Sequence, residues 1–252
     1  GTMNGLYVYD GQTFKNYTQL DGLPNNNVRG IYQTRDGKIW LGTMGGLVVY
    51  DGHTFEIIQA KYVGVWAFHQ TDDGNLWITT NDGFCMYDGQ QFHHYPIQKD
   101  GQSLGTIEVV EDNVGVLWFA SVTGGVIKYD GHTTTVYDEA DGLATKDIWN
   151  SEKTKDGTLW FGGGFQSNVN GLTNYDGVTF RILSTKDGLI DNRVRSSAAS
   201  KLGGIWLGTD NGISYCDNTG PTSTFTNFLP EVGLGTRQVL SIYESSDGIL
   251  WC

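Results

Sequence analysis

The chain lacks several features that mark familiar classes of protein. Its 252 residues include four prolines, three cysteines and no long apolar run. Because a helix needs roughly 20 apolar residues to cross a bilayer, we expect no membrane insertion by this segment. An odd number of cysteines cannot all pair within one chain, which argues against a fold held together by disulfides.

Cationic residues are scarce as well. Sixteen Lys and Arg stand against 28 Asp and Glu, which gives a formal net charge of −12. Proteins bind nucleic acids largely by neutralising phosphates with basic side chains, so this balance argues against a nucleic-acid partner. No signal peptide is evident and the chain starts at Gly1 instead of a methionine, which favours a processed or excised segment.

Glycine and aromatic residues are abundant instead. The chain has 36 glycines, eight tryptophans and 13 tyrosines, and aromatic residues make up 13 % of it. Collagen-like and disordered glycine-rich chains do not have such an aromatic content. The combination is typical of short aromatic strands joined by tight turns.

One phrase recurs along the chain. Its clearest copies are TRDGKIWLGTMGGLVVYDGHTF at 34–55, TDDGNLWITTNDGFCMYDGQQF at 71–92 and KDGTLWFGGGFQSNVNGLTNYDGVTF at 155–180. Each copy contains one tryptophan at a fixed place, and we call these six residues the head tryptophans. They are Trp40, Trp77, Trp118, Trp160, Trp206 and Trp251. Their spacings of 37, 41, 42, 46 and 45 residues match the period of a four-stranded propeller blade.

The two ends of the chain complete a further copy of the phrase. The chain stops at SSDGILWC and starts at GTMNGLYVYDGQTF, and the wrapped spacing is 41. We therefore predict an all-β fold, a six-bladed β-propeller with four antiparallel strands per blade, as a single domain over residues 1–252. One blade is shared between residues 1–17 and 239–252, and this closure removes exposed sheet edges.

These copies resemble the two-component regulator propeller repeat, whose pattern combines D-x-x-G-x-L-W-I-G-T, G-L-x-x-Y-D-G and D-G-L. The resemblance covers essentially the whole chain. In that family the repeats form the extracytoplasmic sensor region of bacterial hybrid histidine kinases, many of which respond to glycan fragments. The resemblance therefore implies a bacterial sensor propeller that is periplasmic or extracellular.

Most of the repeated residues are expected to be structural. The head tryptophans and the Tyr-Asp-Gly tyrosines occupy one place in every blade, where they bury apolar surface. Cys216 takes the place of such a tyrosine, and Cys252 follows Trp251 at a strand position. We expect three reduced thiols, all buried.

No catalytic pattern is evident. Nucleophile-elbow, HExxH, Walker and dinucleotide-binding motifs are missing, and the adjacent His93 and His94 point to opposite faces of a strand. We predict a non-catalytic protein with no cofactor and no metal site. One alternative is a carbohydrate lyase or hydrolase in which His69 or converging carboxylates act. The candidate carboxylates are Glu108, Glu111, Asp147 and Glu152. A second alternative is a protein–protein scaffold.

Length differences between the copies indicate a ligand-binding face. The loop after Trp160 has about five extra residues within 164–170, the connection before Trp77 is four residues shorter, and an insertion lies near 218–227. With the four strands of each blade lettered A to D from the innermost outward, these segments are D–A or B–C connections, which share one face of a propeller. Loops on a rigid scaffold commonly carry binding sites.

The start of the inner strands sharpens this interpretation. Eleven residues before the head tryptophans stand Arg29, Trp66, Ile107, Trp149, Arg195 and Leu240. Aromatic faces that stack, together with Arg and amide groups, suit a sugar or a carboxylate ligand. The alternative is that the tryptophans fill gaps between blades and the arginines pair with local carboxylates. The predicted ligand-binding residues are Asn27, Arg29, Trp66, Asp147, Trp149, Phe165, Arg193 and Arg195.

Overall fold

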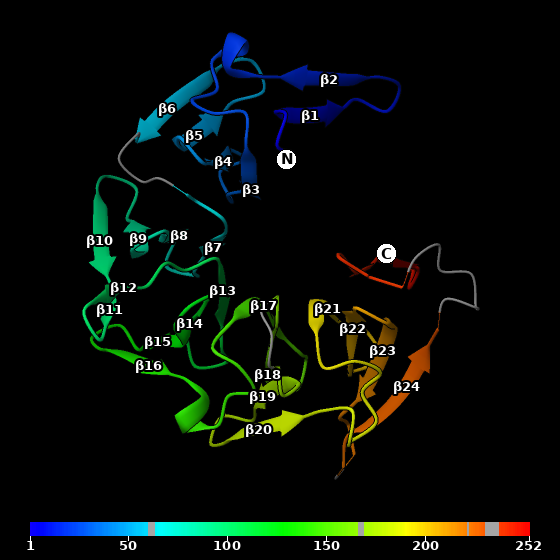
Figure 1. The fold of residues 1–252 in the computed structure, drawn as a ribbon. Helices are drawn as coiled ribbons and strands as arrows, with labels where there is room; N and C mark the ends of the chain where they lie inside the picture. The colour runs from blue at the N-terminus through cyan, green and yellow to red at the C-terminus, as the bar shows by residue number, and fades with distance from the viewer. Residues whose placement is uncertain (60–63, 166–168, 221, 230–236) are drawn as a thin grey trace. The chain divides into compact units, whose positions relative to one another are not determined.

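A computed structural model describes residues 1–59, 64–165, 169–220, 222–229 and 237–252 (Figure 1). These residues form two compact units, unit 1 (Gly1–Val109) and unit 2 (Val110–Cys252). The two helices in the described residues are single 3-10 turns, η1 (Gln19–Asp21) and η2 (Glu139–Asp141). Neither has the length or the apolar run that crossing a bilayer requires.

Unit 1 contains two four-stranded antiparallel sheets in which the strands pair in chain order. The first consists of β3 (Val28–Gln33), β4 (Ile39–Thr43), β5 (Gly46–Tyr50) and β6 (Phe55–Gln59). The second consists of β7 (Phe68–Gln70), β8 (Leu76–Thr80), β9 (Gly83–Tyr87) and β10 (Phe92–Pro96). Two hairpins complete the unit, β1 (Leu6–Tyr9) with β2 (Phe14–Tyr17) and β11 (Gln98–Lys99) with β12 (Gln102–Ser103).

Three further four-stranded sheets follow along the chain with the same strand order. They consist of β13 (Glu108–Glu111), β14 (Leu117–Ser121), β15 (Gly125–Tyr129) and β16 (Thr134–Tyr137); of β17 (Ile148–Lys153), β18 (Leu159–Gly163), β19 (Leu172–Tyr175) and β20 (Phe180–Leu183); and of β21 (Val194–Ala199), β22 (Ile205–Thr209), β23 (Gly212–Asp217) and β24 (Thr224–Phe228). A two-stranded sheet, β25 (Tyr243–Glu244) with β26 (Leu250–Trp251), ends the chain. The predicted all-β fold with four-stranded antiparallel blades is confirmed, while the six-bladed ring with one shared blade stays a prediction.

The repeated Tyr-Asp-Gly turns explain the regular outer hairpins. In the turn between β5 and β6, the Asp51 carboxylate accepts hydrogen bonds from the backbone N–H groups of His53 and Thr54, both at 2.7 Å. Gly52 has a φ of 98°, which few residues other than glycine adopt. The Tyr50 hydroxyl donates to the Gly52 carbonyl at 2.7 Å and closes the turn. The Tyr-Asp-Gly residues therefore form and stabilise the turn, in agreement with the structural role that their fixed place in the repeat predicts.

The cores of the sheets contain most of the head tryptophans. Trp40, Trp77, Trp118 and Trp160 are each at most 7 % exposed, and Trp206 is partly buried. Trp251 is 61 % exposed, so the prediction of a core position was wrong for it. Its strand β26 pairs only with β25 among the described residues, and a two-stranded sheet is too narrow to bury a large ring.

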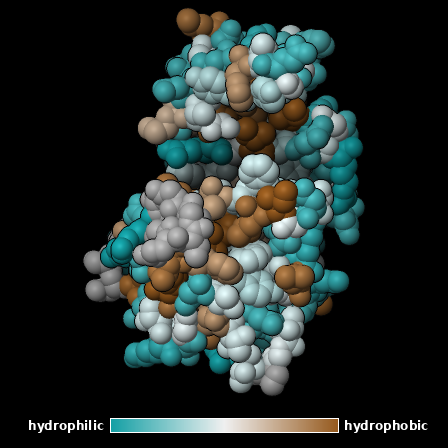
Figure 2. Space-filling model, turned by 90° about the vertical axis from the view of Figure 1, so that its right-hand side faces the viewer, coloured by the Kyte–Doolittle hydropathy of each residue, from teal (hydrophilic) through white to brown (hydrophobic). Residues whose placement is uncertain are grey.

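Apolar side chains are exposed around this terminal sheet. Leu240, Tyr243 and Ile249 are 67, 62 and 51 % exposed. Figure 2 views the molecule from the right-hand side of Figure 1. Hydrophobic residues, in brown, lie on the surface in the lower part of this view. An exposed apolar patch on a narrow sheet marks a place where further protein surface can pack.

The cysteines form no disulfide in the described residues, as predicted. Cys85 and Cys216 are buried, but Cys252 is exposed, so its predicted core position was wrong. Cys252 follows β26 and therefore lies beyond the narrow terminal sheet. Burial raises the pKa of the Cys216 thiol to about 12, which leaves almost no reactive thiolate at neutral pH.

Thiol titration under native conditions is therefore expected to detect one fast group, Cys252, and two slow groups. After denaturation the same reagent should detect three thiols, because no disulfide has to be reduced first. Substitution of Cys252 by Ser should remove the fast phase alone. Three fast thiols in the native protein, or only one after denaturation, would contradict these assignments.

Candidate functional site

The predicted site residues divide between the two units. Unit 1 contains Asn27, Arg29 and Trp66, and unit 2 contains the other five. In unit 1 the guanidinium of Arg29, on β3, lies over the Trp66 ring, with Cζ 4.7 Å from the ring centroid. Gly30 permits this approach of neighbouring blades, because a Cβ there would lie 2.6 Å from the Trp66 carbonyl oxygen. Arg29 and Trp66 thus form a cation–π pair at the start of an inner strand.

The hydrogen bonds of Asn27 stabilise the loop that precedes β3. Its backbone N–H donates to Asn25 Oδ1 at 2.8 Å, and its carbonyl accepts from Met44 N at 3.1 Å. Its side-chain Oδ1 is buried and has no hydrogen-bond donor among the described residues. Asn27 directly precedes β3, and its backbone joins this loop to the end of β4.

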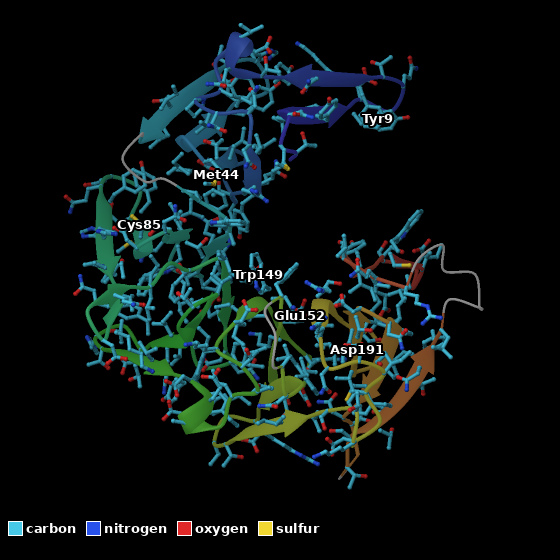
Figure 3. The ribbon with its side chains drawn as sticks, in the orientation of Figure 1. Tyr9, Met44, Cys85, Trp149, Glu152 and Asp191 are labelled. Atoms are coloured by element: carbon cyan, nitrogen blue, oxygen red, sulfur yellow. The ribbon has the colours of Figure 1, made fainter. Side chains whose placement is uncertain are left out.

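In unit 2 an aromatic pair lies at the start of β17. The Trp149 indole N–H donates to Asp147 Oδ1 at 2.6 Å, and the Asp147 side chain is buried. The rings of Trp149 and Phe165 have centroids 4.4 Å apart and are inclined by 54°. Phe165 is 50 % exposed, and Trp149, labelled in Figure 3, is partly buried. The structure therefore brings these three predicted residues together.

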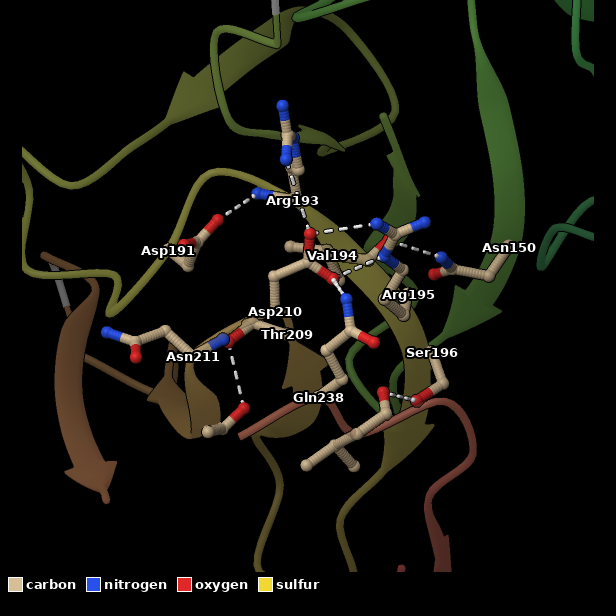
Figure 4. Close-up of polar contacts among 12 residues, drawn as sticks. Asn150, Asp191, Arg193, Val194, Arg195, Ser196, Thr209, Asp210, Asn211 and Gln238 are labelled. Carbon is tan, nitrogen blue, oxygen red and sulfur yellow. Dashed lines mark hydrogen bonds and ion pairs between the residues drawn. The ribbon is translucent and has the colours of Figure 1, made fainter. Parts of the chain in front are cut away.

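Arg195, on β21, joins this pair. Its Cζ lies 3.9 Å from the centroid of the Phe165 ring. Nε and Nη2 of Arg195 donate to the two carboxylate oxygens of Asp210 at 2.6 and 2.8 Å (Figure 4). The two side chains are 9 and 13 % exposed, so this is a nearly buried, bidentate ion pair. The pairing lowers the pKa of Asp210 and raises that of Arg195.

Hydrogen bonds between β17 and β21 hold the stack in place. Asn150, which follows Trp149, donates to the Val194 carbonyl at 3.0 Å and accepts from the Ser197 hydroxyl at 2.9 Å. Both partners belong to the strand that carries Arg195. The inner strands of these neighbouring blades are thus fixed side by side, and Phe165 contacts a side chain from each of them, Trp149 and Arg195. We call Trp149, Phe165, Arg195 and Asp210 the aromatic–arginine stack.

The side chain of Arg193 is more exposed and less tightly paired than that of Arg195. Its side chain is 46 % exposed, and Nη1 lies 3.5 Å from Asp210 Oδ2, a long contact. Gln238 Nε2 approaches the other carboxylate oxygen of Asp210 at 3.4 Å. The alternative interpretation of the arginines, pairing with a local carboxylate, therefore applies fully to Arg195 and only weakly to Arg193.

The repeat pattern did not predict Asp210 as the partner of Arg195. Asp210 directly follows β22, at the place that Met44, Asn81, Val122 and Gly164 occupy in the other blades. That place lies beside the beginning of the inner strand, because β22 runs antiparallel to β21. Among these aligned residues only Asp210 is a carboxylate, and it occurs in the blade that also contains Arg195. This coincidence in the sequence could have predicted the ion pair.

Other predicted features lie apart from the stack. Glu152 lies near the end of β17, five residues after Asp147, which directly precedes this strand. Burial raises the pKa of Glu152, and its Oε1 accepts a hydrogen bond from Lys153 N at 3.1 Å. No group of three or more His, Cys, Asp or Glu side chains in the described residues is placed to hold a metal ion. Three variable segments fall partly outside the described residues: 60–63, 166–168 within the long loop, and 221 within the insertion.

Successive four-stranded antiparallel sheets with inner strands side by side define a β-propeller protein. Residues 22–45 and 61–82 match the family model of the two component regulator propeller, so the predicted resemblance to this repeat is confirmed in these two segments. A comparison with curated protein sequences finds no match.

Solved structures with the same fold include extracellular and surface proteins. The extracellular domain of a hybrid two-component system from B. thetaiotaomicron is 22 % identical, with a TM-score of 0.59; the match covers 100 % of this chain and 36 % of that one. This chain thus spans about a third of that structure's length. Virginiamycin B lyase from Staphylococcus aureus is 14 % identical, with a TM-score of 0.67, over 89 % of this chain and 83 % of that one. PorZ, a surface component of the type-IX secretion system of Porphyromonas gingivalis, is 14 % identical, with a TM-score of 0.66, over 96 and 41 % of the two chains.

Proposed function

We propose that this chain is a non-catalytic ligand-binding propeller of the sensor type, acting outside the cytoplasm in the periplasm or at the cell surface. Its ligand is a glycan fragment or another small polar molecule. The observation that carries this proposal is the aromatic–arginine stack, in which the half-exposed Phe165 ring lies against Trp149 and against an arginine that Asp210 binds through two hydrogen bonds. The family repeats and the fold shared with extracellular two-component sensor domains support the sensor class.

The charges of the stack favour a neutral polar ligand over an anionic one. Asp210, at 2.6 Å, neutralises the positive charge of Arg195. The electrostatic attraction that remains for a ligand carboxylate is therefore small. The exposed part of Phe165 offers an apolar face on which the C–H face of a sugar ring can stack. Arg193 and Gln238 lie near Asp210 at the exposed rim, where they can donate hydrogen bonds to hydroxyl groups. Arg29 and Trp66 form a second arginine–aromatic pair, in unit 1.

Substitutions of the stacking residues test the proposal. Screening a panel of oligosaccharides by calorimetry should identify a ligand, and Phe165→Ala and Trp149→Ala should each weaken its binding by tenfold or more, since each removes about 1–3 kcal/mol of contact. Leu202→Ala, at a 77 % exposed apolar residue in unit 2, is the matched control and should bind normally.

The same incubations distinguish a binding protein from an enzyme. Chromatography of the oligosaccharides after incubation should recover them unchanged. Cleavage products that depend on Glu152 would replace the binding function with the lyase or hydrolase alternative. Normal affinity in both stack variants would remove the stack from the binding surface.

A further inference from the structure

Two pockets of similar size lie at the same place in the repeat, one in each unit. The unit 1 pocket, of about 340 Å³, lies between the sheets β3–β6 and β7–β10. The unit 2 pocket, of about 310 Å³, lies between the sheets β13–β16 and β17–β20. Both are lined by the A–B and C–D turns, at the opposite end of the strands from the aromatic–arginine stack. They are therefore separate from the proposed ligand surface.

The two pockets share an aromatic frame that comes from the repeat. A head tryptophan of one blade meets the Tyr-Asp-Gly tyrosine of the next blade in both. The ring centroids are 5.4 Å apart for Trp40 and Tyr87, and 4.8 Å apart for Trp118 and Tyr175. Since this frame is common to both pockets, any difference in what they bind must come from the residues around it.

The charges around the frame differ in sign. In unit 1 the lining contains two cations, Arg35 and Lys38, and one carboxylate, Asp36. Asn113 and Val116 stand at the places of the two cations in unit 2. The charged residues that line the unit 2 pocket are Asp112, Asp156, Asp176 and Lys128. The unit 1 lining is therefore net positive, and the unit 2 lining is net negative.

The two cations of unit 1 are available to a ligand. Their side chains are 56 and 60 % exposed. Lys38 Nζ lies 3.4 Å from Asp36 Oδ2, and Arg35 Nη2 lies 2.7 Å from Asp72 Oδ1, a carboxylate that is itself fully exposed. Because exposed ion pairs of this kind contribute little, both groups can turn toward a ligand anion at small cost.

The hydrogen bonds of the two tryptophan indoles also differ between the pockets. In unit 2 the Trp118 N–H donates to Asp112 Oδ2 at 3.1 Å. In unit 1 the equivalent place is occupied by Thr34, whose hydroxyl lies within hydrogen-bond distance of Asp36 and of the Lys38 carbonyl. The buried Trp40 N–H has no hydrogen-bond acceptor among the described residues. The place next to the indole thus carries a carboxylate in unit 2 and a hydroxyl in unit 1, where the Asp36 carboxylate accepts a hydrogen bond from that hydroxyl.

We propose that the unit 1 pocket binds a small organic monocarboxylate, with the carboxylate between Arg35 and Lys38 and an apolar body against the Trp40–Tyr87 frame. Hydrogen-bonded ion pairs to Arg and Lys supply the specificity for the anion, and Trp40, Leu76 and Tyr87 supply an apolar wall for its body. The proposal stands on this pocket alone and does not depend on the glycan surface.

Phenylacetate is the probe that tests this site, with the indole N–H resonances of Trp40 and Trp118 as reporters in an NMR titration of the whole chain. A saturable shift of the Trp40 resonance is expected while the Trp118 resonance stays in place. Phenethylamine has a similar aromatic body with the opposite charge and should bind the unit 1 pocket at least tenfold more weakly. In the double variant Arg35→Gln, Lys38→Gln, the affinity for phenylacetate should fall at least tenfold.

Lys128→Gln is the matched control, because it removes a cation from the unit 2 pocket and should leave phenylacetate binding unchanged. Both residues of the double variant are exposed, and the single variants confirm the effect if the double variant is unstable. Equal shifts of Trp40 and Trp118, equal affinity for the two probes, or unchanged affinity in the Arg35 and Lys38 variants would each overturn the proposal. Absence of a saturable Trp40 shift at millimolar phenylacetate would do so as well.

Discussion

Deletion of residues 1–17 is expected to lower the free energy of unfolding of unit 1 by about 3–5 kcal/mol, since it removes a buried leucine and several hydrogen bonds. Leu6 is 4 % exposed and packs in one cluster with Leu23 and Val28. The Tyr17 hydroxyl lies 3.0 Å from that of Tyr50, and the Thr2 carbonyl accepts from Val28 N at 2.9 Å. Urea unfolding followed by tryptophan fluorescence measures the loss.

The same deletion tests the proposed closure, in which β1–β2 and β25–β26 complete one blade. Amide hydrogen exchange in residues 243–251 of unit 2 should then accelerate strongly, although the deletion lies in unit 1, because the sheet loses its neighbouring strands. Leu6→Ala is the control: it destabilises unit 1, leaves the strands in place, and should not change that exchange. If the deletion also leaves exchange at 243–251 unchanged, the two terminal sheets are independent.

Asp210→Asn is expected to destabilise unit 2 by about 2–4 kcal/mol, because it leaves the nearly buried guanidinium of Arg195 without its counter-charge. Asp72→Asn is the matched control. Asp72 pairs with Arg35 at a similar distance of 2.7 Å, but its side chain is fully exposed, so the loss should stay within about 0.5 kcal/mol. Equal effects of the two substitutions would show that burial does not strengthen the Arg195 pair.

The pH dependence of this pair has a defined sign. Arg195 lowers the pKa of Asp210, so the ionised carboxylate stabilises the folded state above the pKa of an unfolded Asp, about 3.9. This stabilisation is lost as the pH falls through the lower pKa of the folded state. The difference in unfolding free energy between the native chain and Asp210→Asn should therefore be constant at neutral pH and shrink below about pH 4. A difference that grows on acidification would contradict the assignment.

The sequence determined the blades and their turns because these depend on residues close together along the chain. The spacing of the head tryptophans reflects the length of a four-stranded blade. The Tyr-Asp-Gly phrase specifies an outer turn by itself, as Asp51, Gly52 and Tyr50 show with three local hydrogen bonds. Alignment of the inner strands also placed Trp149 and Arg195 correctly at the start of β17 and β21.

What surrounds each repeated position was decided by the tertiary structure. The same tryptophan is buried in a four-stranded sheet at Trp160 and exposed in a two-stranded one at Trp251. Asp210 became the partner of Arg195 because antiparallel pairing of β21 and β22 sets the end of one strand beside the start of the other. The opposite charges of the two inter-blade pockets likewise arise from turns of neighbouring blades that meet only in space. A repeat specifies its own hydrogen bonds, whereas contacts between repeats depend on side chains that the pattern leaves free to vary.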